Sequence, residues 1–112
     1  MAIYNFQPSA GASVGSTIKV TTGATVASVN TVLAFTNVLA TDILVTNAGT
    51  VTAFVRLSPQ ASPVATTADV PVLAGTSRIF ANPAPSGNCG AAVIPVSGTA
   101  VDVYFTPGVG SF

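Results

Sequence analysis

The stretch that decides the fold is Asp42-Ile-Leu-Val-Thr-Asn-Ala-Gly-Thr-Val-Thr-Ala-Phe-Val-Arg56. Its residues alternate in polarity on both sides of Asn47-Ala48-Gly49, a pattern typical of two β-strands joined by a turn. If Gly49 supplies a positive φ in a three-residue loop, the strands pair as a hairpin with Val45 opposite Val51. The predicted core face then contains Ile43, Val45, Val51, Ala53, Val55 and Leu57. The opposite face carries Asp42, Leu44, Thr52, Phe54 and Arg56.

Two further turns share this signature, Ala74-Gly75-Thr76 and Ser97-Gly98-Thr99. A Ser97-Gly98 turn predicts a second hairpin, in which one face is apolar and the other polar. Proline cannot donate to a strand ladder, so Pro95 predicts that its strand is an edge strand or is bulged. The predicted apolar face pairs Ile94 with Val101 and Ala92 with Val103 and continues to Phe105, whereas Asp102 and Tyr104 point the other way.

The chain as a whole, rich in Val and Thr and punctuated by 10 Gly and 8 Pro, fits seven to nine short strands, including those of the two hairpins. Further strands are expected at 17–21, with Ile18 and Val20 inward, at 32–35 and at 77–80. Long surface loops are expected at 58–71 and 82–90. We predict an all-β, single-domain β-sandwich at 15–112, with jelly-roll topology preferred over immunoglobulin-like. Residues 1–14 are expected to form an N-terminal arm that lies on a neighbouring molecule, or else a frayed terminus.

Charge excludes several classes of function. The chain has three Lys or Arg, three Asp, no Glu and no His, and a net charge of zero. Such a chain lacks the cations that bind nucleic acid or anionic lipid, so neither is an expected partner. It also lacks the groups for acid–base catalysis near neutral pH and for a zinc site. We therefore expect no enzyme, no metal and no cofactor.

The remaining features point to a protein that is made in the cytoplasm and binds other proteins. The lone Cys89 is expected to be a small buried hydrophobe, and the first residues lack the pattern of a signal peptide. No apolar run is long enough to span a membrane. Because aromatic residues and Arg are enriched at protein interfaces, the candidate interface residues are Tyr4, Phe6, Phe54, Arg56 and Tyr104.

Four turn and strand motifs follow one another along the chain. They are the Asn-x-Gly of 47–49, the Pro-x-x-Ala-Gly of 71–75, the Gly-Thr-Ala of 98–100 and the Thr-Pro-Gly-x-Gly of 106–110. In these segments the chain resembles small bacteriophage virion proteins of the capsid decoration or cement type. The resemblance covers roughly 60% of the chain, chiefly from Asp42 onward.

That resemblance implies a trimeric structural protein of the capsid surface that binds the major capsid protein and stabilises the assembled head. It brings no catalytic residue with it. The alternative that it leaves open is an adhesive or carbohydrate-binding module associated with the tail, the head–tail junction or a fibre.

Overall fold

The computed structural model describes residues 7–8, 17–23, 28–33, 41–60, 62–84 and 89–109. Within these ranges the chain forms strands and turns, without a helix. The strands expected at 17–21 and 77–80 are confirmed. The one expected at 32–35 begins earlier, at Val29, and its residues 34–35 lie outside the described residues. In chain order the strands are β1 (Gln7–Pro8), β2 (Ile18–Thr21), β3 (Val29–Leu33), β4 (Asp42–Asn47), β5 (Ala53–Ser58), β6 (Val70–Val72), β7 (Ser77–Ala81), β8 (Cys89–Pro95) and β9 (Asp102–Val109).

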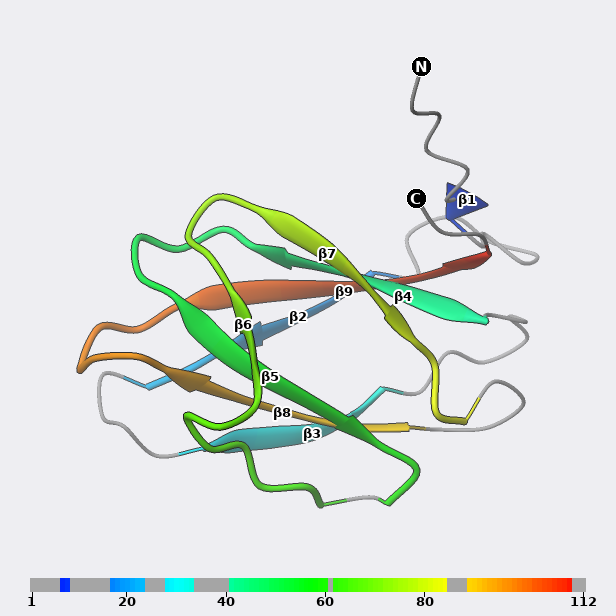
Figure 1. Ribbon diagram of the computed structural model, residues 1–112, viewed down its shortest axis with the longest axis horizontal. Coiled ribbons are helices and arrows are strands. Elements are labelled where there is room, and N and C mark those ends of the chain that lie inside the picture. The colour runs from blue at the N-terminus through cyan, green and yellow to red at the C-terminus, as the bar shows by residue number, and fades with distance from the viewer. Residues whose placement is uncertain are drawn as a thin grey trace.

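The strands form two antiparallel sheets (Figure 1). In the first sheet β9 lies between β4 and the strands β1 and β2, and β7 pairs with the other side of β4. The second sheet has the order β3-β8-β5-β6. All the pairs are antiparallel. The predicted all-β fold class is therefore confirmed.

The three Gly-containing turns do not close hairpins, and both predicted pairings are wrong. Each turn instead joins the two sheets, because β4, β7 and β9 belong to the first sheet and β5, β6 and β8 to the second. Val45 pairs with Arg78 on one side and Phe105 on the other, not with Val51. Alternation determines which face of a strand is buried, but a short turn can lead to either sheet.

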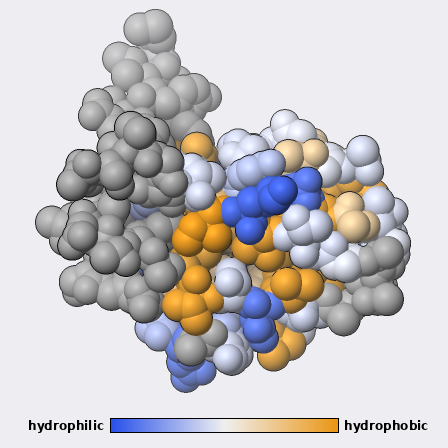
Figure 2. Space-filling view, turned by 180° about the vertical axis from the view of Figure 1, so that it is seen from behind, coloured by the Kyte–Doolittle hydropathy of each residue, from blue (hydrophilic) through white to orange (hydrophobic). Residues whose placement is uncertain are grey.

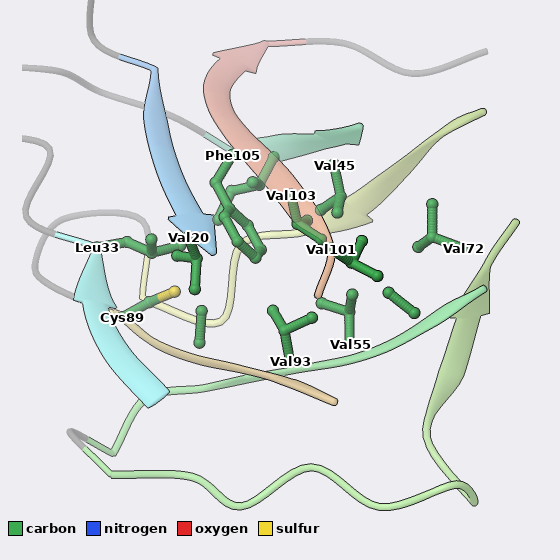
Figure 3. Packing of buried hydrophobic residues seen from close by; sticks show 13 residues of the cluster. Val20, Leu33, Val45, Val55, Val72, Cys89, Val93, Val101, Val103 and Phe105 are labelled. Carbon is green, nitrogen blue, oxygen red and sulfur yellow. The ribbon is translucent and has the colours of Figure 1, made fainter. Parts of the chain in front are cut away.

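One hydrophobic core is built from both sheets (Figure 3). The predicted inward residues of β2, β4, β5 and β9 belong to it or pack against it, so those faces are confirmed. Cys89 is buried, as expected. The buried members are Val20, Leu33, Ile43, Val45, Ala53, Val55, Val72, Cys89, Ala91, Val93, Val101, Val103 and Phe105.

Strand β8 departs from the prediction in two ways. Ala92 and Ile94 were expected in the main core, but they alternate with its members and form a second cluster on the other face of β8. β8 also pairs on both sides, so it is not an edge strand. Pro95 is tolerated because it is the last residue of β8 and lies beyond Val93, where the pairing with β3 ends.

Residues 59–60 and 62–69, which we call the strap, lie between β5 and β6 in the chain and pass over the outer face of the second sheet. A long surface loop was expected here, but Pro63 and Ala65 are buried. A Cβ atom added to Gly90 on β8 would fall on the Gln60 carbonyl oxygen and lie 2.7 Å from Pro63 Cδ. The strap therefore covers β8, and this explains why the whole of β8 is buried.

Candidate protein interface

The structure does not bring the five predicted interface residues together. Tyr4 and Phe6 lie outside the described residues. Phe54 and Arg56 are on β5, on the face of the second sheet that turns away from the core, and Tyr104 is on the outward face of β9 in the first sheet. The candidates that can be placed therefore belong to two different faces of the molecule.

Arg56 is engaged within the molecule. Its Nε atom donates to Asp69 Oδ1 over 2.9 Å, and the side chains are 49% and 12% exposed respectively. Partial burial raises the pKa of Asp69. Hydrogen bonds from the Thr66 backbone and from Arg56 lower it by more, so the pKa lies below its ordinary value of 3.8. Arg56 thus anchors the end of the strap, and only part of its side chain is free for a partner.

Phe54 is also partly committed to the fold. It is half-buried and packs against Ala65 of the strap together with Ala92 and Ile94 of β8. The middle of the strap, which packs on Phe54, is held by the amide of Ala65, which donates to Ser28 Oγ over 2.9 Å. Phe54 and Arg56 therefore both hold the strap in place. That these two residues also contact another protein stays a prediction.

Tyr104 lies on a broader surface that the strap does not cover. The outward residues of the first sheet alternate with buried ones along β4 and β9. We call this surface the hydroxyl face. It contains Thr17, Lys19 and Thr21 beside or on β2, Asp102, Tyr104 and Thr106 on β9, Asp42, Leu44 and Thr46 on β4, and Ser77, Ile79 and Ala81 on β7.

The hydroxyl groups of this face satisfy one another across neighbouring strands. Thr17 and Thr106 are hydrogen-bonded over 2.9 Å, and Thr46 and Ser77 over 2.8 Å. Thr21 donates to Asp102 over 2.7 Å. A hydroxyl that already has a partner costs less free energy to remove from water than an unpaired one. The hydroxyl face can therefore be covered by another protein at a modest desolvation cost.

Charge is sparse on the surface as a whole. In the view of Figure 2, strongly hydrophilic residues form a few small patches between apolar and weakly polar ones. The whole chain carries only six charged side chains, and three of them, Lys19, Asp42 and Asp102, lie on the hydroxyl face. Contact with this face requires few charges to be paired or desolvated.

Asn47 is a structural residue whose role the sequence prediction missed. Its side chain is fully buried at the end of β4. Nδ2 donates to the carbonyls of Val51 and Val72, each over 2.9 Å, and Oδ1 accepts from the amide of Gly49 over 2.8 Å. Asn47 therefore fixes two of the turns between the sheets, those at 48–50 and 74–76, and its place in an Asn-x-Gly motif was the available signal.

The conformation expected of Gly49 is wrong. Gly75 is the glycine for which a positive φ, of 70°, is found among the described residues. At Gly49 an added Cβ atom would lie 2.8 Å from Val101 Cγ1. Gly49 is thus required by the close approach of the turn to Val101 rather than by a left-handed backbone.

The described residues offer no assembled chemical centre. No group of three or more His, Cys, Asp or Glu gathers among them. In the same part of the chain, no helix has the length and hydropathy to cross a membrane. Burial raises the pKa of the Cys89 thiol above its ordinary value, which keeps this residue in its neutral form. The surfaces of the two sheets are what remains as candidate functional features.

Comparisons with protein families, with curated proteins and with solved structures find no match for this chain.

Proposed function

We propose that the protein is a structural virion protein that decorates a bacteriophage capsid. In this role it binds the major capsid protein on the outside of the assembled head and stabilises the shell. The proposal combines the resemblance in the turn motifs with two features of the molecule, its strand order and the hydroxyl face.

The strand order supports a β-sandwich with jelly-roll topology. Among β2 to β9, the first strand pairs with the last, β3 pairs with β8, β4 pairs with β7 and β5 pairs with β6. This nested pairing is expected when one long antiparallel hairpin is rolled into two sheets. Jelly rolls are common in viral capsid proteins and in lectins. Fold alone does not specify function, which depends on a particular surface of the molecule.

The hydroxyl face is the observation that carries the proposal. It is a sheet surface with internally satisfied hydroxyls, and half-buried Leu44 and Tyr104 lie on neighbouring strands. Tyr is enriched among the residues that dominate binding energy at protein interfaces. We assign this face to the capsid contact, with Tyr104 as its anchor.

Binding to the assembled shell alone is sufficient to stabilise it. A protein that binds the intact shell and not its dissociated subunits shifts the equilibrium toward the shell by mass action. No catalytic group is needed for this function. The protein contributes a rigid fold and a surface that adds contacts between capsid subunits.

The proposal is tested by co-sedimentation of the purified protein with phage shells that lack it. We expect saturable binding to assembled shells and none to free capsid subunits. Tyr104→Ala should weaken binding by about tenfold or more, as expected for an interface anchor. Thr67→Ala, an exposed change in the strap, is the matched control. Equal binding by the Tyr104 variant would remove this face from the contact.

A carbohydrate-binding role on a tail or fibre is the second candidate, because Tyr104 also has polar neighbours. It lies opposite Lys19 on β2 and Thr46 on β4. Sugar sites commonly place an aromatic ring among such groups. Selective binding on a glycan array that Tyr104→Ala abolishes, without binding to shells, would favour this second function.

A further inference from the structure

The edge strands of the two sheets are not protected equally. An edge strand exposes unpaired backbone N–H and C=O groups, with which a strand of another chain can pair. Proteins usually prevent this pairing with Lys, with Pro or with an inward-pointing charge. Within the described ranges, the edges are β2 and β7 in the first sheet and β3 and β6 in the second. β1 pairs with the end of β9 on the same side as β2.

Three of these edges carry a recognised protective residue. β2 contains the exposed Lys19, and β6 contains Pro71, which cannot donate to a ladder. β7 contains Arg78, which pairs with buried Val45 and thus lies on the inward side of the edge. Its Nη1 atom donates to the Pro71 carbonyl over 3.1 Å, so Arg78 also bridges the edges of the two sheets.

The fourth edge, β3, has no such residue. Its sequence is Val29-Asn-Thr-Val-Leu33, without charge, Pro or Gly. Among the described residues β3 pairs with β8 alone. Asn30 is exposed and Val32 is 40% exposed, whereas Val29 packs against the core and Leu33 is buried. The core-facing side chains of β3 are therefore buried or half-buried, whereas the backbone edge that does not pair with β8 lacks a protective residue.

We propose that β3 pairs antiparallel with β3 of a second copy of this chain, across a two-fold axis at Thr31. The pairing places Thr31 opposite its own copy and Asn30 opposite Val32 of the second copy. A self-pairing interface brings identical residues together at the axis, where a charge would meet the same charge. β3 carries no charge and therefore meets this requirement in every register, and a Thr–Thr pair is favourable between antiparallel strands.

In such a dimer the second sheet of one copy continues, through the paired β3 strands, into the second sheet of the other copy. In this register half-buried Val29 of one copy lies opposite Leu33 of the other, and because Leu33 is already fully buried, the backbone ladder supplies most of the contact. Because a pairing of five residues is smaller than a standard interface, we expect weak association, with a dissociation constant of roughly 1–100 µM. This inference is independent of the capsid contact, since β3 and the hydroxyl face belong to different sheets.

Sedimentation of the full chain over a concentration series tests the pairing. We expect the mass to rise from 11.0 kDa toward twice that value. Asn30→Lys combined with Val32→Lys places like charges opposite each other across the axis and should give a monomer at every concentration. Asn30→Lys combined with Val32→Glu places opposite charges together and should restore the dimer.

The control adds the same two charges elsewhere on the molecule. Ser97→Lys with Thr99→Lys changes two exposed turn residues and should leave the dimer intact. Circular dichroism and urea unfolding of each variant show that its fold is retained. A monomeric natural chain, a mass of three chains, or a dimer that survives the double Lys change would overturn the proposal. A Lys/Glu variant that stays monomeric would overturn the register at Thr31.

Discussion

The side-chain amide of Asn47 donates a hydrogen bond to the main-chain carbonyl of Val72 over 2.9 Å. Asn47 ends β4 in the first sheet and Val72 ends β6 in the second, so this bond ties the two sheets together. The backbone of Asn47 adds a further link, since its carbonyl accepts from Gly75 and its amide donates to Thr76. Two of the three sheet-crossing turns, at 48–50 and 74–76, are thus held by Asn47.

We predict that Asn47→Ala lowers the free energy of unfolding by about 2–5 kcal/mol. The substitution leaves the carbonyls of Val51 and Val72 and the amide of Gly49 without their partner, and each buried unsatisfied group costs about 1–3 kcal/mol. Urea unfolding measures the change. Thr50→Ala, at an exposed position of the same turn, should change stability by less than about 0.5 kcal/mol. Equal stability of the two variants would contradict the role of Asn47.

We predict that Gly90→Ala displaces the strap. The added methyl group falls on the Gln60 carbonyl and close to Pro63, and overpacking of this kind costs about 1–3 kcal/mol. Thermolysin should then cleave near Val64 faster than in the natural chain. Gly75→Ala is the control, because its Cβ meets nothing within 4 Å and its cost comes from the positive φ. If both variants resist cleavage equally, the strap does not rest on Gly90 as described.

We predict that the ion pair between Arg56 and Asp69 contributes about 0.2–1 kcal/mol, the range of partly exposed pairs. The folded-state pKa of Asp69 is lowered, so the stabilisation is present above the ordinary value of 3.8 and is lost as the pH falls through the folded-state pKa. Urea unfolding of the natural chain and of Asp69→Asn at several pH values measures this. The difference should be largest near pH 7 and shrink at acid pH. A difference that grows on acidification would contradict the sign.

The sequence indicated which face of each strand is buried better than it indicated which strands pair with one another. Alternation correctly indicated the inward sides of Ile43, Val45, Val103 and Phe105, because burial follows directly from the period of two along a strand. The partners of these strands depend on long-range packing, and a Gly turn is compatible with a hairpin or with a crossing between sheets. The hairpin predictions failed for this reason.

The surroundings of the predicted interface residues were harder to predict, because these residues lie on two sheets and two of them contact the strap. Phe54 and Arg56 were correctly expected away from the main core. Their contacts with Ala65 and Asp69 arise from the path of the strap, which no local sequence pattern predicts. One signal was available in β8. The uninterrupted run of small and apolar residues from Cys89 to Pro95 is typical of a strand covered on both faces.

Cryo-electron microscopy of capsids incubated with the purified protein tests the central claim most directly. The account predicts ordered additional density on the outside of the shell into which the two-sheet fold fits, with the hydroxyl face and Tyr104 toward the capsid surface. Shells that carry no ordered density at saturating protein, or density that presents the strap to the shell and leaves Tyr104 in solvent, would contradict it.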